Sequence, residues 1–369
     1  MDPEDMNPRP WLRRHVTKPF ADRLVPITMA EGRRSLTMAK PEASERPRLP
    51  PWFRTTLPSG DAMEAFRDTK ASVKDNALHT VCEEARCPNI HDCWSSGDAT
   101  FMIAGQECTR GCRFCAVGTI KRAPPLDPEE PGHLAHAVAS MPLRHAVITV
   151  VNRDDLADSG ASHYRACLDA VHERSPEVTL ELLCSDLAGD HDALANLLDG
   201  APLRVFAHNV ECVPRLDKTV RDHRASFDQS LSILREARRL RPDLLIKTSI
   251  MVGLGETDEE LEAAMALVRE AGVDLITLGQ YLAPSSKHLA VDRFPEPERY
   301  EEWADHAMDL GFLGVASGPL VRSSFKAGLL LRACTEENWN GSMPGATVRV
   351  RPGAAADRHP HRRTSGGEA

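Results

Sequence analysis

From Ala99 onward, short apolar runs alternate with segments of helical periodicity, and this alternation limits the possible folds more than any other feature. Repeated strand–helix units of this kind imply parallel strands joined by right-handed crossovers. They either close into a barrel or form an open, doubly wound sheet, and periodicity does not choose between the two. The helical segments lie near 134–140, 160–173, 190–199, 226–239 and 257–271. The predicted strands are Thr100–Ala104, Ala146–Val151, Val178–Leu183, Arg204–Val210, Leu244–Met251 and Leu275–Tyr281.

The segment 257–271 shows how these helices are predicted. Thr257 and Glu260 have the spacing of a capping box, in which each side chain accepts a hydrogen bond from the other residue's backbone. Leu261, Met265 and Val268 then recur at helical spacing. We therefore expect a helix that begins after Thr257 and buries this apolar stripe.

Four regions are expected along the 369 residues. Residues 1–50 are rich in Pro and Arg without a sustained period, which predicts a flexible extension. Residues 51–98 hold Trp52 and the first three cysteines, and residues 99–330 hold the strand–helix units. Residues 331–369 are predicted to be a largely disordered tail, because the chain returns to Pro, Gly, His and Arg after Arg351.

Charge and hydropathy argue against two classes of partner. The formal net charge is −9, so there is no global basic field that would favour nucleic acid. No run of about 18 or more apolar residues exists, so a membrane span is not expected. Asp2, Glu4 and Asp5 count against a mitochondrial presequence, although Arg and Ser follow later. The sequence therefore predicts a cytoplasmic protein and leaves a mitochondrial location open.

The cysteines are concentrated: six of the ten fall between Cys82 and Cys115, which indicates metal or redox chemistry rather than a disulfide framework. Cys108, Cys112 and Cys115 form a C-x3-C-x2-C pattern directly after the first predicted strand. Three thiolates on one tight loop can hold three irons of a [4Fe–4S] cube and leave the fourth iron open to a substrate. The alternative is a structural zinc loop with a fourth ligand elsewhere.

A second group, Cys82, Cys87 and Cys93, has C-x4-C-x5-C spacing. Taken alone it is compatible with zinc, with His91 as a fourth ligand. Beside another loop of three cysteines, a second iron–sulfur cluster is the more economical interpretation. The remaining cysteines lack pairing or spacing and are expected to be buried or inert thiols; they are Cys167, Cys184, Cys212 and Cys334.

These motifs resemble the lipoyl synthases of the radical S-adenosylmethionine (SAM) superfamily. Cys108–Cys115 is similar to the superfamily signature, and Cys82–Cys93 is similar to the extra motif of lipoyl synthases. The resemblance covers roughly residues 50–330. Its other segments are Ala99-Thr-Phe-Met-Ile, Val147-Ile-Thr-Val, Arg153-Asp-Asp-Leu, His208-Asn-Val-Glu211, Val252-Gly-Leu-Gly-Glu-Thr257, Leu278-Gly-Gln-Tyr281 and Gly318-Pro-Leu-Val-Arg-Ser-Ser-Phe325.

The resemblance implies an α/β fold with a partial (βα)6 radical-SAM barrel, an N-terminal auxiliary-cluster extension and a C-terminal closing segment. It also implies two [4Fe–4S] clusters and SAM. One cluster would cleave SAM to a 5′-deoxyadenosyl radical, which takes hydrogen from C6 and C8 of a protein-bound octanoyl-lysine group. The auxiliary cluster would donate the sulfur. Implied partners are octanoylated lipoyl-carrier domains (the E2 subunit of 2-oxoacid dehydrogenases and the glycine cleavage H protein) and an electron donor such as ferredoxin or flavodoxin.

The resemblance also assigns site residues. Ser324, with Ser323 as the fallback, would complete the auxiliary cluster, although in another context these serines would be assigned to a turn or a helix N-cap. Asn209 and Glu211 would bind the SAM ribose. Further candidate contacts with the cofactor are Phe114, Lys247, Arg153 and the Gly253 turn.

Four positions depart from the family pattern: Phe325 stands in place of Tyr, Asn152 of Asp, Gly111 of a basic residue and Cys212 of Thr. None removes a proposed ligand. Two alternatives therefore stay open, a different two-cluster radical SAM sulfur-inserting enzyme and a diverged lipoyl synthase paralogue. A zinc-stabilised binding protein without catalytic activity is a third, from another class.

Overall fold

The computed structural model describes residues 49–54, 59–75, 79–80, 87, 89–95, 99–337, 339 and 346–356. Their central feature is one nine-stranded sheet in the order β1-β2-β5-β6-β7-β8-β9-β10-β11. Seven neighbouring strands are parallel, and antiparallel β1 and β11 form the two edges. These strands are β1 His79–Thr80, β2 Thr100–Ile103, β5 His145–Val150, β6 Thr179–Leu183, β7 Val205–Ala207, β8 Leu245–Val252, β9 Leu275–Gln280, β10 Gly314–Gly318 and β11 Thr347–Val350. Strands β3 Glu107–Cys108 and β4 Gly118–Thr119 form a separate pair.

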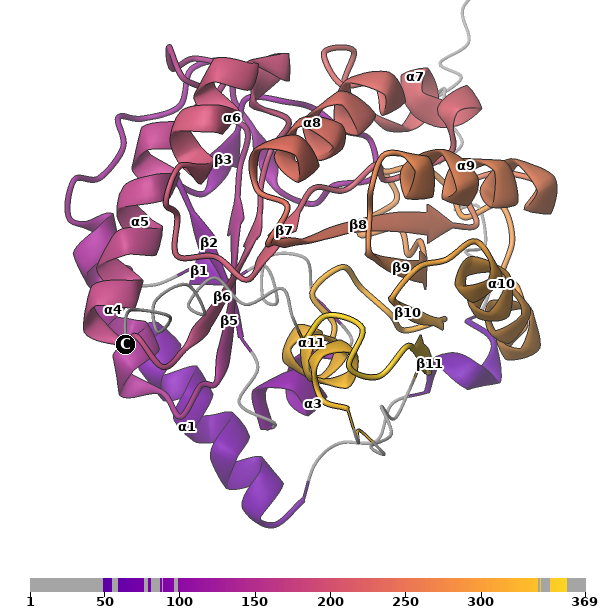
Figure 1. Cartoon of the computed structure of the whole chain (residues 1–369), viewed down its shortest axis with the longest axis horizontal. Helices are drawn as coiled ribbons and strands as arrows, with labels where there is room; N and C mark the ends of the chain where they lie inside the picture. The colour runs from indigo at the N-terminus through magenta and orange to yellow at the C-terminus, as the bar shows by residue number, and fades with distance from the viewer. Residues whose placement is uncertain are drawn as a thin grey trace, which may run out of the picture. The chain divides into compact units, whose positions relative to one another are not determined.

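Helices follow most of the parallel strands and cover the outer face of the sheet (Figure 1). None of the described helices has both the length and the hydropathy that crossing a bilayer requires. The capping box of Thr257 and Glu260 is present, as predicted, with both reciprocal hydrogen bonds. The helices are α1 Asp61–Asp75, α3 Ile90–Ser95, α4 Glu130–Ser140, α5 Ala161–Arg174, α6 His191–Leu198, α7 Asp217–Val220, α8 Phe227–Leu240, α9 Asp258–Glu270, α10 Pro297–Asp309 and α11 Ala327–Thr335.

The sheet curves without closing. Among the described strands no ladder joins β1 to β11, so the sheet is open. Helix α11 contacts both β5 and β10, which four other strands separate in the sheet order. One short helix can reach both strands only if the sheet wraps around it, and Figure 1 shows α11 on the inner side. The predicted α/β fold is therefore confirmed as an open, mostly parallel sheet, with α11 as the C-terminal closing segment.

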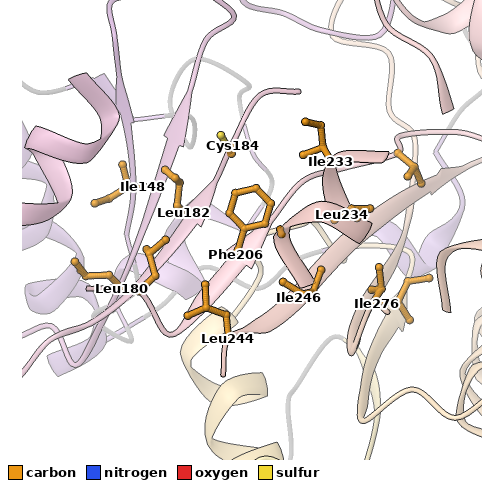
Figure 2. Packing of buried hydrophobic residues seen from close by; sticks show 14 of the residues in the cluster. Ile148, Leu180, Leu182, Cys184, Phe206, Ile233, Leu234, Leu244, Ile246 and Ile276 are labelled. Carbon is orange, nitrogen blue, oxygen red and sulfur yellow. The ribbon is translucent and has the colours of Figure 1, made fainter. Parts of the chain in front are cut away.

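Each face of the sheet has its own core. On the outer face Phe206, Ile246 and Ile276 pack in the cluster that includes Ile233 and Leu234 of α8 (Figure 2). The preceding residue of each strand faces inward and belongs to a second cluster, which contains Phe66, Trp94, Phe325 and Leu331. Strands covered on both faces need apolar residues at successive positions, which explains why they are nearly continuous hydrophobic runs. The inner-face strand residues of this cluster are Val205, Leu245, Leu275 and Ala316.

The six predicted strands correspond to β2 and β5–β9, but the sequence did not indicate β10. Its residues are small because the closing segment packs directly on this edge. A Cβ atom at Gly314 would lie 2.5 Å from Cys334 Sγ, and one at Gly279 in β9 would lie 2.0 Å from the Val321 carbonyl oxygen. A strand built from small residues has little of the hydrophobic signal on which strand prediction relies.

The region 331–369, expected to be a largely disordered tail, begins with structure. Helix α11 continues to Thr335, and β11 pairs with β10 from Thr347 to Val350. The alternating side chains of β11 explain this difference, because Val348 and Val350 pack against the inner core. Residues 357–369 and most of the predicted extension 1–50 lie outside the described residues.

Candidate active site

The cysteine loop, residues 108–115, lies at the carboxyl end of the parallel strands. After β2 the chain turns through Ala104 and Gly105, whose φ angles are 68° and 100°. The backbone N–H of Thr109 then donates to the Asn152 carbonyl oxygen, 3.0 Å away and just after β5. The loop is thus attached to the ends of two neighbouring strands, where parallel α/β sheets place their ligand sites.

Two backbone N–H groups point at sulfur atoms of this loop. The N–H of Arg110 lies 3.4 Å from Cys108 Sγ, and the N–H of Asp222 lies 3.3 Å from Cys112 Sγ. Such contacts favour the thiolate form, which is the form that binds iron. The loop therefore presents sulfur donors already supported by hydrogen bonds.

The spacing of the three thiols argues against a single zinc ion. Among the described residues, only one group of three His, Cys, Asp or Glu side chains has ligand atoms within 4.8 Å of one another, and it does not contain these thiols. In a tetrahedral zinc site the sulfur atoms would lie about 3.8 Å apart. Burial raises the pKa of Cys112 to about 11 and that of Cys115 to about 12, so metal binding must displace protons. The wider spacing and the set of three thiols fit a cluster.

A buried ion-pair network lies under the cysteine loop. The guanidinium of Arg110 donates to Asp154 at 2.7 Å and to Asp186 at 2.6 Å. The side chains of Arg110 and Asp186 are 2% and 1% exposed. Burial alone would lower the pKa of Arg110, but the hydrogen bonds from it to the two carboxylates raise that pKa overall. The network holds the middle of the loop against the ends of the strands. The sequence analysis missed it because its partners lie far apart along the chain.

Two further anchors hold the loop, one at Gly111 in its middle and one at its last residue, Cys115. The carboxylate of Asp222 accepts a hydrogen bond from the Gly111 N–H at 2.8 Å, and Arg224 donates to the same carboxylate. His288 lies within hydrogen-bonding distance, 2.9 Å, of the Cys115 carbonyl oxygen. No motif pointed to these residues, because each acts by its position in a distant loop rather than by a local pattern.

Asn209 and Glu211, the predicted ribose-binding pair, lie together at the end of β7. Asn209 Nδ2 donates to Glu211 Oε1 at 3.2 Å, and the φ angle of Glu211 is 68°. Burial raises the pKa of Glu211, while the nearby charge of Arg221 acts to lower it. The charge of Glu211 in turn raises the pKa of Cys112, which places the pair beside the cysteine loop. A diol could accept from and donate to this amide and carboxylate.

Three other predicted contact residues have partners within the protein. Phe114 is half-buried and packs against the outer core. Lys247 donates from Nζ to Glu181 Oε1 at 2.7 Å, and both side chains are fully buried inside the curved sheet. Arg153 pairs with Asp155 and donates to the Ala104 carbonyl oxygen. Lys247 and Arg153 therefore have structural partners in this conformation.

The Gly253 turn follows β8 and uses its N–H groups internally. The N–H groups of Gly253 and Leu254 donate to the Glu256 carboxylate at 2.7 and 2.9 Å. The φ angle of Gly253 is 92°, and a Cβ atom there would lie 2.1 Å from Gln280 Nε2. The glycine is required by this close approach, and the turn offers fewer free backbone donors than its sequence suggested.

The second cysteine group meets the C-terminal segment. Cys87, Cys93 and Ser324 line one small cavity together with Arg322. Burial lowers the pKa of Arg322, and its guanidinium donates to the Val321 carbonyl oxygen at 2.7 Å. Cys82 lies outside the described residues. The described part of the site therefore brings Ser324 to two of the three predicted thiols.

Two polar contacts clamp these segments together. Asn89 Nδ2 donates to the Leu320 carbonyl oxygen at 2.5 Å, across 231 residues of sequence. The Nζ atom of Lys326 lies 2.8 Å from Asp92 Oδ2 on α3, and its side chain is 4% exposed. These contacts, which we call the C-terminal clamp, hold the 320–326 segment against the helix that carries Cys93.

The zinc alternative for this group required His91 as a ligand. His91 packs against Phe66 with ring centroids 4.5 Å apart and ring planes tilted by 46°. Its nitrogen atoms do not join Cys87 and Cys93 within 4.8 Å among the described residues. The arrangement of the described residues therefore gives no support to a compact zinc site with His91.

The departures from the family pattern leave the described donors in place. Phe325 is 3% exposed and packs in the inner core, where its ring makes apolar contacts that do not require a hydroxyl group. Cys212 is buried beside Asp217. Asn152 contributes its backbone carbonyl to the cysteine loop, a contact that does not depend on the side chain.

Comparison with known proteins gives two family matches. The model described as the radical SAM superfamily matches residues 102–268. The model described as the N-terminal domain of lipoyl synthase of the radical SAM family matches residues 26–87. The superfamily implies SAM and one [4Fe–4S] cluster, and the cysteine loop has the donor set for that cluster.

Curated relatives carry the same family name. The mitochondrial lipoyl synthase of Xenopus laevis is 48% identical over 294 residues, which cover 78% of each chain. The human mitochondrial lipoyl synthase is 48% identical over 295 residues, again 78% of each chain. Among solved structures, methylornithine synthase (PylB) has a TM-score of 0.47 at 11% identity and covers 69% of this chain and 78% of its own.

These names correct the expected location. The sequence predicted a cytoplasmic protein from the acidic residues Asp2, Glu4 and Asp5. The relatives are named mitochondrial, so the cytoplasmic prediction is contradicted and the comparison points to mitochondria. Three acidic side chains are a weak signal, since Arg and Ser, which presequences favour, follow them.

Proposed function

Because this chain belongs to the lipoyl synthase family of the radical SAM superfamily, we propose that it inserts two sulfur atoms into a protein-bound octanoyl-lysine group, at C6 and C8. The sulfur donor in this proposal is a second, auxiliary [4Fe–4S] cluster held by Cys82, Cys87, Cys93 and Ser324. The observation that carries it is the shared cavity of Cys87, Cys93 and Ser324. The clamp across 231 residues supports a built site rather than a chance meeting of side chains.

Different residues of the chain have different roles in this proposal. When bound, SAM and the two clusters would supply the electron, the hydrogen-abstracting radical and the sulfide. Cys108, Cys112 and Cys115 would hold the first cluster with one iron open, and Asn209 with Glu211 would hold the ribose. The protein's part is to orient one alkyl C–H and one carbon between the two sites, because an unactivated alkane has no acidity for a base to use.

Ser324 has a specific place in this proposal. A serine oxygen is a hard ligand, poorly matched to an iron whose other ligands are soft thiolates. Such an iron is released more easily than one held by four cysteines, which suits a cluster whose sulfides are consumed. The half-buried position of Ser324 in the cavity is compatible with this role.

The proposed substrates are octanoylated lipoyl-carrier domains, and the proposed reductant is a small electron-transfer protein such as ferredoxin or flavodoxin. A flexible octanoyl chain needs binding energy from the carrier to keep it in register. Free octanoate should therefore be a poor substrate. Equal turnover of free octanoate and an octanoyl-domain would contradict this part of the proposal.

Substitution at Ser324 tests the auxiliary site. Ser324→Ala should lose sulfur insertion, while SAM cleavage survives because the cysteine loop is separate. Ser324→Cys should keep its iron yet transfer sulfur poorly, since the new ligand is softer and tighter. Ser323→Ala is the matched control and should be mild. Loss of sulfur insertion in Ser323→Ala with an active Ser324→Ala would move the ligand to Ser323, and two harmless substitutions would contradict the auxiliary site.

A further inference from the structure

Outside both cysteine sites, one cluster of metal-ligating side chains lies between α4 and α5. Glu130 in the first turn of α4 and His163 and Cys167 on α5 have ligand atoms that all lie within 4.8 Å of one another. The cluster is mostly removed from solvent: the exposed fractions are 19% for Glu130 and 11% for His163, and Cys167 is fully buried. No other group of three such side chains in the described part of the chain is this close.

From this geometry we propose that Glu130, His163 and Cys167 bind a zinc ion. An imidazole nitrogen, a thiolate and a carboxylate oxygen are the three donor types that zinc takes in proteins. His163 and Cys167 are four residues apart on one helix, so both side chains face the same side, and the neighbouring helix supplies the carboxylate. Water could take the fourth position through the partly exposed rim formed by Glu130 and His163.

The distances require little rearrangement. Donor atoms around tetrahedral zinc lie roughly 3.3–3.8 Å apart, given bonds of about 2.0–2.3 Å. Here Nε2 of His163 and Oε2 of Glu130 are 2.5 Å apart, so they share a hydrogen bond in this conformation. A metal ion would replace that proton and increase the distance between the two atoms by about 1 Å.

The residues around the cluster orient the Glu130 carboxylate, and the arginine beside it has its own carboxylate partner. The Ala104 N–H donates to Glu130 Oε2 at 2.9 Å, which is the kind of outer contact that fixes a metal-binding carboxylate. Arg153 donates from its guanidinium to the carbonyl oxygen of the same residue, Ala104. Its charge is balanced by a two-point contact with Asp155, with distances of 2.9 Å.

The position of the site gives the ion a structural role. Ala104 directly follows β2 and has a φ angle of 68°, and the chain enters the cysteine loop four residues later. A zinc ion bound to Glu130 and His163 would tie α4 and α5 to this turn, and so to the start of the loop. This inference does not depend on the proposed sulfur insertion, because the ligands belong to neither cysteine site.

The test uses the full-length protein with both clusters reconstituted, dialysed against buffered Zn²⁺ and analysed for zinc and iron. Wild type should hold about one zinc per chain, and Cys167→Ala and His163→Gln should bind zinc at least roughly tenfold more weakly with unchanged iron. His163→Gln can keep a hydrogen bond to Glu130, so it separates metal binding from packing. Cys334→Ala, which removes another buried free thiol, is the control and should keep its zinc.

Three results would overturn the proposal. Wild type could hold no zinc at concentrations that saturate ordinary protein sites, which would leave only a hydrogen-bonded pair beside a buried thiol. Cys167→Ala could retain the wild-type amount, which would place the zinc elsewhere, for example in a cysteine site that has lost its iron. Equal zinc loss in Cys334→Ala would show that binding depends on general stability rather than on these ligands.

Discussion

The two cysteine sites differ in how the chain brings their donors together. Cys108, Cys112 and Cys115 lie within eight consecutive residues, and distant residues only support the loop. The auxiliary site instead needs two distant segments to meet, since Ser324 reaches Cys87 and Cys93 only when the C-terminal segment packs inside the curved sheet. A site built from one loop survives damage elsewhere, whereas a site assembled across the fold depends on the contacts that close it.

The largest expected effect tests whether the two sites are separate. In Cys112→Ala the cysteine loop keeps two thiolates, so the formation of 5′-deoxyadenosine should fall at least about 1000-fold. The auxiliary site should keep its iron, about four per chain out of about eight in wild type. Product analysis by chromatography and iron analysis on one sample check both numbers. SAM cleavage at the wild-type rate in this variant would show that the cysteine loop is not the site of SAM cleavage.

Next in size is the buried support of the loop. Arg110→Met leaves the buried Asp186 without its ion-pair partner and leaves Asp154 with only Arg224, which should cost about 3–5 kcal/mol of stability. We expect the loop to lose iron and SAM cleavage while the auxiliary site keeps its iron. Arg239→Met, which breaks an ion pair whose arginine is 69% exposed, is the control and should change neither. An Arg110→Met variant that keeps full SAM cleavage would show that the network is dispensable.

Breaking the C-terminal clamp should impair the auxiliary site and spare the cysteine loop, at a smaller cost in stability. Lys326→Met removes the ion pair with Asp92, worth about 1 kcal/mol because Asp92 is 53% exposed. Sulfur insertion should fall several-fold while SAM cleavage stays unchanged. Arg332→Met breaks an exposed pair between Arg332 of α11 and Glu336, the residue after that helix, and serves as the matched control. Equal losses of both activities in Lys326→Met would contradict the separation of the two sites.

The last prediction concerns stability alone and is a pH dependence that arises at His208. His208 lies within hydrogen-bonding distance of the Cys184 carbonyl oxygen and of Ser230, and burial lowers its pKa to about 4. Its unfolded pKa is about 6.5, so its stabilising contribution is complete above that pH and is lost as the pH falls toward 4. Between pH 7.5 and 5.5 the loss should be about 1–1.5 kcal/mol. His208→Asn should flatten this part of the melting-temperature profile, and an unchanged profile would contradict the assignment.

The sequence predicted the features that are local and missed those that are not. Six strands and both cysteine groups are visible because their signals lie within a few residues. The Arg110 network and the His288 contact join positions 44 to 173 residues apart, which no periodicity reveals. Strand β10 was hidden because close packing demands small residues at Gly314. Ser324 is proposed as a ligand only through the family motif, since two adjacent serines indicate a turn just as well.

The origin of the inserted sulfur tests the central claim most directly. The enzyme is reconstituted with heavy-isotope sulfide, freed of excess, and given one turnover on an octanoylated carrier with SAM, reductant and ordinary sulfide in the buffer. Mass spectrometry of the carrier should show two heavy sulfur atoms, and Ser324→Ala should give none while still cleaving SAM. A product carrying ordinary sulfur would mean that the site lined by Cys87, Cys93 and Ser324 is not the donor.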